Sequence, residues 1–220
     1  MENISTSISD ICAKYPTLNQ ENDTQIKGIL PIDKVVNDEH IVESFEIEVD
    51  FKERIPKVKE LGNRTEGYYH KYKNGNLCLE TDFNQLMYLE NHTYLEWLDY
   101  FVINYFCSFY YYQKYKCYPY GERNHRYGDF FGFAEYMEIH PSQAWSILEY
   151  IVNKKYRGHD LCPCGSGKRI RNCHKDVVLR FKKDNDVYKS LKKLYEKTKG
   201  EILENEKVKQ SKKKYLWKTK

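Results

Sequence analysis

Three cysteines and one histidine stand within thirteen residues, and this cluster constrains the fold more than any other sequence feature. Residues 162–174 read CPCGSGKRIRNCH and supply Cys162, Cys164, Cys173 and His174. Three thiols and one imidazole are a usual ligand set of a closed structural zinc site. Zinc contributes about 10–16 kcal/mol of folding free energy in small peptides, enough to order a segment with few apolar residues. We therefore expect a structural Zn²⁺ ion here, the alternative being reduced cysteines in a loop.

Two glycines follow the first cysteine pair of this cluster. Gly165 and Gly167 allow a turn with positive φ angles and point main-chain amides at the thiolates. The pattern C-P-C-G-S-G-K-x-x-x-x-C-H closely resembles the SEC-C motif, which we place at residues 159–175. This resemblance implies an accessory zinc module that docks protein partners or ribosomes and performs no chemistry. Zinc with four protein ligands has no open position for a substrate, which agrees with such a role.

The rest of the composition indicates a reducing compartment. A length of 220 residues is typical of one domain of about 150 residues with an appendage. The opening Met1-Glu-Asn-Ile is polar, and no apolar run approaches the roughly 20 residues of a membrane span. We therefore expect a cytoplasmic protein with free thiols and no membrane partner. The cysteines outside the cluster are Cys12, Cys78, Cys107 and Cys117.

Charge and aromatic residues are unevenly distributed. Residues 175–220 contain 16 Lys and Arg against 7 Asp and Glu, a net charge of +9, whereas the whole chain carries +4. This basic segment could bind nucleic acid or an acidic partner. A solvated helix with a lysine-rich end is the favoured interpretation, because few aromatic residues accompany the lysines. The 21 tyrosines and 10 phenylalanines instead concentrate between Tyr68 and Tyr136, which indicates an aromatic core.

Strict alternation of apolar and acidic residues predicts a sheet with one buried and one wet face. Phe45, Ile47 and Val49 fall on one face of their segment, and acidic residues separate them. Strands are expected at residues 25–32, 40–51 and 56–61, with a turn at 37–39.

Apolar residues at helical spacing predict several helices. The longest has an apolar face that includes Leu98, Phe101 and Phe109. Pro141 suits the first position of a helix, and Gly200 is expected to end the basic helix. Helices are expected at 3–14, 92–116, 130–138, 143–155 and 176–199, and loops or links at 16–24, 62–81 and 82–91. The predicted fold class is α+β: an antiparallel strand meander packed on helices, then a small zinc knuckle and a basic C-terminal helix.

Scattered motifs between residues 25 and 137 carry a second resemblance. They are the strand Phe45-x-Ile-x-Val, the segment Ile55-Pro-Lys-Val, the loop Asn74-Gly-Asn-Leu-Cys-Leu and the element Gly121-Glu-Arg-Asn-His. With the order of elements, they resemble the ubiquitin-conjugating (E2) fold. They are similar to prokaryotic E2-like families of antiphage operons such as CBASS. The resemblance implies a UBC-like domain whose cysteine forms a thioester with a protein C-terminus.

Cys78 is the candidate nucleophile, because a thiol on a loop can accept an acyl group at neutral pH. His70 or His125 would deprotonate the thiol or the incoming amine. Asn76 or Asn74 would stabilise the oxyanion. The eukaryotic H-P-N signature is absent, since Lys-Tyr follows His70, so the resemblance does not fix the asparagine. The alternative for Cys78 is an inert thiol in the core.

We therefore expect an E2-like domain at residues 1–157, the SEC-C zinc knuckle at 158–176, and a basic helix and tail at 177–220. The expected function is transfer of a protein C-terminus from a thioester on Cys78 to an amine. By resemblance, the partners are a ubiquitin-like protein or an operon nucleotidyltransferase, and an activating (E1-like) enzyme. The alternatives are a non-catalytic zinc-binding adaptor that recruits a protein or ribosomal partner, and, less favoured, a nucleic-acid-binding protein.

Overall fold

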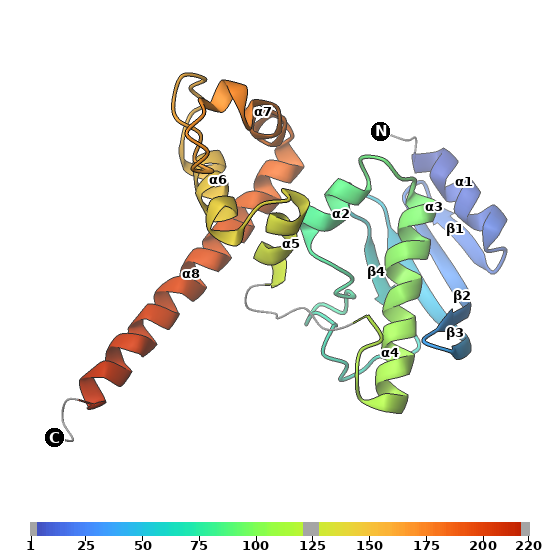
Figure 1. Ribbon diagram of the computed structural model, residues 1–220. Coiled ribbons are helices and arrows are strands. Elements are labelled where there is room, and N and C mark those ends of the chain that lie inside the picture. Colours follow the sequence, from blue (N-terminus) through green and yellow to red (C-terminus); the bar gives the residue numbers. More distant parts are fainter. Residues whose placement is uncertain (1–3, 121–127, 217–220) are drawn as a thin grey trace. The chain divides into compact units, whose positions relative to one another are not determined.

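The chain folds into two compact units, Met1–Glu122 (unit 1) and Arg123–Lys220 (unit 2), coloured along the sequence in Figure 1. The computed structural model describes residues 4–120 and 128–216. Unit 1 holds an antiparallel sheet with helices, and unit 2 holds helices and the cysteine cluster, so the predicted α+β class is confirmed. The expected domain boundary between residues 157 and 158 falls inside unit 2, because helices on both sides of it pack together.

Four antiparallel strands form the sheet of unit 1 in the order β1-β2-β3-β4. They are β1 (Leu18–Asn22), β2 (Gln25–Val36), β3 (Glu39–Asp50) and β4 (Lys57–Glu60). The three predicted strands are confirmed as β2, β3 and β4. The loop predicted at 16–24 is wrong, because five of its residues form β1.

Main-chain pairing holds β1 to β2 although its sequence, Leu-Asn-Gln-Glu-Asn, is mostly polar. Leu18 is the buried residue of this strand. Gly28 lies opposite Leu18 with a φ of 146°, and a Cβ at this position would come within 2.1 Å of the Thr17 carbonyl oxygen. Glycine is therefore required at this close approach of two strands. Hydrophobic periodicity does not reveal such a strand, because its pairing uses the main chain.

The strands β2 and β3 form a long hairpin with a two-residue tip. Asn37 and Asp38 take left-handed φ angles of 49° and 64°, as a two-residue hairpin turn requires. Along β3, Phe45, Ile47 and Val49 are buried, and the acidic residues between them are partly exposed. The predicted turn and the one-sided burial of the sheet are confirmed.

Helices cover the buried face of the sheet (Figure 1), and their aromatic side chains supply much of the core. Phe106 of α4 stacks on Phe45 of β3 with ring centroids 4.1 Å apart. The helix predicted at 3–14 is confirmed as α1, whereas the link predicted at 82–91 contains α2. The α-helices described in this unit are α1 (Ile4–Lys14), α2 (Asp82–Tyr88), α3 (Tyr94–Trp97) and α4 (Ile103–Tyr115).

A wider, π-helical turn, Leu98–Val102, joins α3 to α4. Ile103 donates its main-chain N–H to the Leu98 carbonyl, five residues back. The predicted long helix is thus confirmed, with this turn in its interior. Its buried stripe repeats every four residues, and an α-helix turns once per 3.6 residues, so the wider turn offsets the drift of the stripe. The stripe consists of Tyr94, Trp97, Leu98, Phe101, Val102, Tyr105, Phe106 and Phe109.

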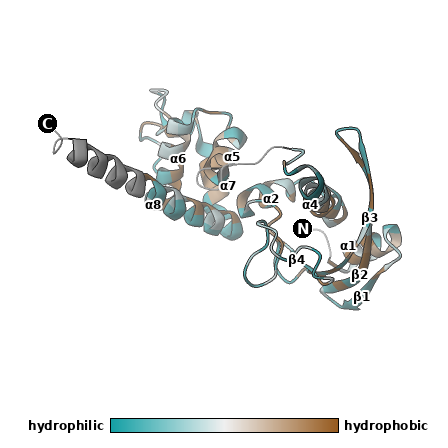
Figure 2. Cartoon of the chain, turned by 90° about the horizontal axis from the view of Figure 1, so that it is seen from below, coloured by the Kyte–Doolittle hydropathy of each residue, from teal (hydrophilic) through white to brown (hydrophobic). Residues whose placement is uncertain are grey.

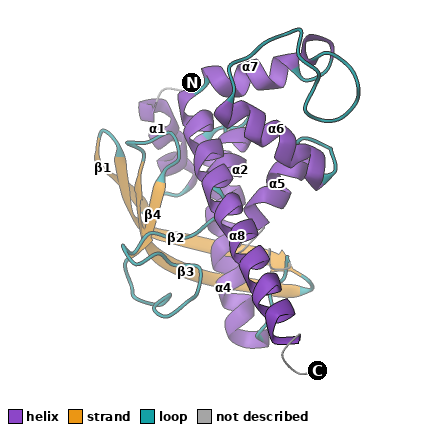
Figure 3. Cartoon of the chain, turned by 90° about the vertical axis from the view of Figure 1, so that its left-hand side faces the viewer, coloured by secondary structure: helices purple, strands orange, loops and turns teal. Residues whose placement is uncertain are grey.

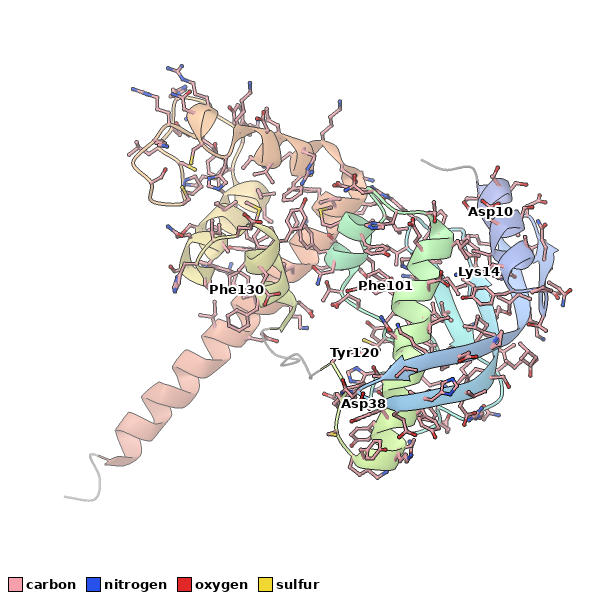
Figure 4. The ribbon with its side chains drawn as sticks, turned by 45° about the vertical axis from the view of Figure 1, so that its right-hand side comes forward. Asp10, Lys14, Asp38, Phe101, Tyr120 and Phe130 are labelled. Atoms are coloured by element: carbon pink, nitrogen blue, oxygen red, sulfur yellow. The ribbon has the colours of Figure 1, made fainter. Side chains whose placement is uncertain are left out.

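Polar contacts hold this long helix against its neighbours. Tyr15 donates its hydroxyl to one carboxylate oxygen of Asp99 over 2.5 Å, and Lys14 (labelled in Figure 4) pairs with the other at 2.6 Å. The segment after α4 returns to the same helix, because the Tyr120 hydroxyl donates to the Asn104 side chain over 3.2 Å. Apolar packing is non-directional, so these polar contacts fix how the helix is oriented against its neighbours.

Unit 2 consists of helices that pack on one another and of the loop between α6 and α7 that carries the cysteine cluster (Figure 3). Trp145 of α6 and Tyr195 of α8 stack with ring centroids 5.1 Å apart. The helices predicted at 130–138 and 143–155 are confirmed, with Pro141 at the first position of α6. The described elements are α5 (Gly128–Tyr136), α6 (Pro141–Asn153), the 3-10 turn η2 (Ile170–Asn172), α7 (Lys175–Lys183) and α8 (Asn185–Leu216).

The single basic helix predicted at 176–199 is wrong in two respects. The chain breaks at Asp184, whose carboxylate accepts the N–H groups of Asp186 and Val187 at 3.1 Å and so caps α8. The helix then continues through Gly200, since an interior glycine costs only about 1 kcal/mol. Figure 2 shows the coloured, N-terminal part of α8 as predominantly hydrophilic. Among the described residues, no helix combines the length and apolar character that crossing a bilayer requires.

Candidate metal centre and candidate thiol site

The cysteine cluster occupies a tight hairpin between α6 and α7. Leu161 and Arg169 bridge its two arms, and Cys162 donates its N–H to the Lys168 carbonyl over 2.8 Å. Gly165 takes a left-handed φ of 78°, the conformation that its glycine identity allows without strain. The hairpin therefore folds the two ends of the motif back onto each other.

The four predicted metal ligands converge on one point. The sulfurs of Cys164 and Cys173 are 3.6 Å apart, and Nδ1 of His174 lies 3.2 Å from the sulfurs of Cys162 and Cys173. All four ligand atoms lie within 4.8 Å of one another. Tetrahedral zinc with Zn–S bonds of about 2.3 Å has sulfur–sulfur edges of about 3.8 Å, so this donor set fits the ion. The cluster is a possible metal-binding site in which protein atoms fill every position.

Burial and hydrogen bonds act on these ligands in different directions. Burial lowers the pKa of His174, which favours the neutral imidazole that binds metals. Burial is also the main cause that raises the pKa of the Cys162 thiol to about 12. At Cys164 burial acts in the same direction, but hydrogen bonds with Ser166, Cys162 and Cys173 together outweigh it and the pKa is lowered. The Ser166 hydroxyl also lies 3.4 Å from the sulfur of Cys173, a contact that sequence reasoning missed.

Gln143 connects the metal hairpin to the first turn of α6. Its Nε2 donates to the Cys164 carbonyl over 2.9 Å, and its Oε1 accepts the N–H of His140 at 3.3 Å. His140 is the N-cap of α6, so one side chain both completes the helix cap and holds the hairpin. A glutamine three residues after an N-cap is the signal from which this role could have been inferred.

Residues 70–78 of unit 1 form a second hairpin within the predicted irregular segment. Lys71 and Leu77 pair across it as an antiparallel bridge. Cys78 donates its main-chain N–H to the carbonyl of His70 over 2.8 Å. His70 and Cys78 are therefore directly opposite each other, and the structure brings these two predicted site residues together.

This hairpin extends the sheet beyond β4. Leu77 donates its N–H to the carbonyl of Val58 over 2.8 Å, and Asn76 bridges Lys59. Cys78 follows these paired residues and is half-buried. Cys78 therefore lies beside the edge of the sheet, and the residue as a whole is partly exposed.

Tyrosine rings lie close around the imidazole of His70. The ring centroids of Tyr118, Tyr68 and Tyr69 lie 5.3, 5.4 and 5.5 Å from that of His70. Tyr68 also packs edge-on against Phe109 of α4, with centroids 5.2 Å apart. These contacts fix the imidazole between the hairpin and the long helix.

The two candidate asparagines differ in their contacts. Asn74 uses its side-chain oxygen to accept the N–H of Asn76 over 3.1 Å, which closes the turn. The side-chain oxygen of Asn76 is buried and has no hydrogen-bond partner in the described part of the chain. Asn74 therefore serves the turn, whereas the amide of Asn76 is available for another role. His125, the remaining predicted site residue, lies outside the described residues.

Buried polar residues that the sequence did not indicate lie near Cys78. Glu60 at the end of β4 is 4% exposed and accepts the N–H and hydroxyl of Thr65 at 3.2 and 3.0 Å. Tyr105 of α4 is 6% exposed. Burial, followed by the nearby charges of Cys78 and Glu60, raises the pKa of Tyr105. From the sequence, a glutamate next to an exposed lysine in a short strand is expected to face solvent. Only the structure shows that Glu60 is buried.

Comparisons of the chain with models of protein families, with curated proteins and with solved structures returned no match. The functional assignment therefore depends on the metal centre and on the hairpin of residues 70–78.

Proposed function

We propose that unit 1 is an E2-like domain that forms a thioester on Cys78 and transfers a protein C-terminus to an amine. The direct opposition of Cys78 and His70 in the hairpin beyond β4 is the main support for this proposal. The order of strand meander, cysteine-bearing loop and long helix is a second support.

Hairpin geometry groups the proposed catalytic side chains. Residues that face each other across a pair, and residues two apart along one arm, have side chains on the same face. This relationship supports a shared face for the imidazole of His70, the carboxamide of Asn76 and the thiol of Cys78. In the proposed reaction His70 accepts the thiol proton, and Asn76 donates a hydrogen bond to the oxyanion.

The reaction balances without a redox step. The Cys78 thiolate attacks the carbonyl carbon of an activated polypeptide C-terminus, either an acyl adenylate or a thioester. A C–S bond forms, and AMP or a thiolate leaves with the electron pair of the broken bond. An amine then attacks the same carbon, so that a C–N bond forms and the C–S bond breaks. The amine proton passes to a base, and the Cys78 thiolate is regenerated.

Trapping the acyl intermediate from cells tests this proposal. The wild-type chain, isolated without reductant, is expected to carry a polypeptide on Cys78 that a thiol reductant releases and mass spectrometry locates. Cys78→Ser should carry an ester that survives the reductant, and Cys78→Ala should carry nothing. Cys117→Ala is the matched control, because it removes an exposed thiol elsewhere in unit 1, and its adduct should equal that of wild type. A wild-type chain without any adduct rejects the transferase.

In unit 2 we propose a structural zinc ion, supported by the donor set and its distances. The resemblance to SEC-C suggests that the metal-ordered hairpin docks a protein or ribosomal partner. Zinc would supply folding free energy to the hairpin, and the chemistry would stay in unit 1. A cytoplasmic setting, which keeps the thiols reduced, belongs to this proposal. The ligands would be Cys162, Cys164, Cys173 and His174.

The closed metal centre also favours a second function, a zinc-binding adaptor without chemistry. The two functions differ in their response to one substitution. Cys78→Ala abolishes the cellular activity of a transferase and leaves that of an adaptor intact. Cys164→Ser removes a metal ligand and should impair docking in both, so it confirms that the assay responds to this protein.

A further inference from the structure

The hairpin of residues 70–78 turns main-chain groups toward the outside of the sheet. Cys78 donates its N–H to the His70 carbonyl and Tyr72 donates to the Asn76 carbonyl, each over 2.8 Å, and these bonds lie on either side of the pair formed by Lys71 and Leu77. In an antiparallel ladder, a residue pair between two such bonds is a non-hydrogen-bonded pair. The N–H and C=O groups of Lys71 and Leu77 therefore point away from each other.

The outward-pointing main-chain groups of Leu77 face the sheet. Its N–H donates to Val58 of β4 over 2.8 Å, which joins this arm to the sheet. By the same geometry the main-chain groups of Lys71 point to the opposite side. Neither its N–H nor its C=O has a hydrogen-bond partner in the ranges 4–120 and 128–216. The main chain of residues 70–72, which we call the open edge, is therefore the boundary of the extended sheet farthest from β1.

Large amphipathic side chains flank the open edge. Tyr69 is 67% exposed and Tyr72 is 55% exposed. Tyrosine is enriched where proteins bind each other, because its ring contributes contact area and its hydroxyl stays solvated. Strand addition combines main-chain hydrogen bonds at a sheet edge with side-chain contacts of this kind. The site therefore offers both components of extended-peptide recognition beside the candidate nucleophile.

We propose that the open edge binds the C-terminal tail of the acyl donor by strand addition, with main-chain hydrogen bonds to Lys71. The inference rests on the proposed function of Cys78 and adds the form of the substrate, an extended polypeptide C-terminus. Adjacent strands are about 4.8 Å apart, so the added strand lies about 10 Å from the arm of Cys78. About three extended residues span that distance, and they pass over His70 to reach the thiol.

A lysine at a sheet edge can also have the opposite role, which is to prevent strand pairing. The test must distinguish this role from strand addition. Lysine side chains on edge strands oppose pairing with other chains. In that role the side chain of Lys71 matters and its main-chain N–H does not. Strand addition makes the reverse prediction, so substitutions that change only one of the two groups distinguish them.

Lys71→Pro and Lys71→Ala form the matched pair. Proline removes the N–H that the tail would use and leaves the hydrogen bonds inside the hairpin in place, and edge positions tolerate it. Alanine removes the side chain, with its 3.4 Å contact to Glu66, and keeps the N–H. The cellular Cys78 adduct should fall about tenfold or more in Lys71→Pro, as for a lost main-chain hydrogen bond. It should stay within about twofold of wild type in Lys71→Ala, because this variant keeps the N–H; the Lys71 side chain is only 13% exposed, so the thermal melt below also tests this variant.

Alkylation with iodoacetamide checks that Lys71→Pro keeps the site intact. This small probe needs no strand addition, so Cys78 should react at the wild-type rate in both variants, resolved by peptide mass spectrometry. A thermal melt of each variant establishes that the fold is retained.

Hydrogen exchange of the wild-type chain gives a second measurement that no substitution can disturb. The Lys71 amide should exchange about tenfold or more slowly in the adduct than in the free chain, whereas the Leu77 amide is protected in both. Unchanged exchange at Lys71 in the adduct, or a wild-type level of adduct in Lys71→Pro, overturns strand addition and leaves the Cys78 proposal standing. A wild-type chain without any adduct overturns both.

Discussion

The main-chain N–H of Cys78 donates to the carbonyl oxygen of His70 across 2.8 Å, which makes these residues neighbours in one small hairpin. Main-chain atoms form this contact, so a substitution of either side chain leaves it in place. The side chains can therefore be exchanged while the hairpin that carries them is retained. This separation of scaffold from chemistry makes the proposed site directly testable.

His70→Ala should lower the yield of the Cys78 adduct by about 10²-fold, the lower end of the range for a lost general base. The tyrosine rings around the imidazole lose a packing partner, so a thermal melt should accompany the measurement. His92→Ala is the control, because this histidine stacks on Tyr88 at 3.8 Å in the segment before α3. An undiminished adduct in His70→Ala would show that another group takes the proton.

The thiols of Cys107 and Cys117 should differ in their reaction with iodoacetamide. Cys107 has no exposed surface, and burial raises its pKa to about 11. A raised thiol pKa leaves less thiolate near pH 8, and the fraction recovers only as the pH approaches that value. Cys117 is exposed and should react about 10²-fold faster in the native chain. The difference should disappear in denaturant, and equal native rates would contradict the burial of Cys107.

Metal removal should destabilise unit 2 and spare unit 1. The purified chain should hold about one zinc ion, measured by elemental analysis, and Cys164→Ser should lose it. The free energy of unfolding of unit 2 should then fall by about several kcal/mol, read from hydrogen exchange of its amides. Cys117→Ser is the matched variant that retains the metal. A chain purified without chelator and free of metal would contradict the assignment.

Gly28→Ala should destabilise unit 1 by about 3 kcal/mol or more, because the new Cβ meets main chain that cannot move freely. The obstructing atom is the Thr17 carbonyl oxygen at 2.1 Å, and the φ of 146° adds strain. Gly67→Ala is the matched control: its φ is 73° and its Cβ would meet nothing within 4 Å. That change should cost only about 1 kcal/mol. Urea unfolding measures both, and equal losses would refute the close approach at β1.

Features that depend on side-chain pattern could be read from the sequence. The alternation of Phe45, Ile47 and Val49 identifies β3, because burial on one face is what the pattern records. The ligand spacing identifies the metal cluster for a similar reason, since the chemistry of the donors restricts their number and type. In both cases the side chains themselves carry the information.

Features that depend on the main chain or on tertiary context could not be predicted from the sequence. The helix α2 has only seven residues, and its capping residue Thr81, which accepts the N–H of Asn84, was its clearest signal. The break at Asp184 follows from the capping preference of a carboxylate within an otherwise continuous helical pattern. The position of Cys78 at a sheet edge depends on the pairing of Leu77 with Val58, which leaves no trace in residue type.

The π-helical turn Leu98–Val102 has a consequence for how this protein tolerates insertions and deletions. The wide turn absorbs one extra residue, so removing a single residue from it would restore an ordinary helix and leave the part beyond nearly in register. Removing a single residue from α4, which has no wide turn, would instead rotate everything beyond by about 100° about the axis. A deletion at Asn104 would therefore swing Phe106 away from Phe45 and separate Phe109 from Tyr68, although every side chain of the proposed chemistry stayed encoded.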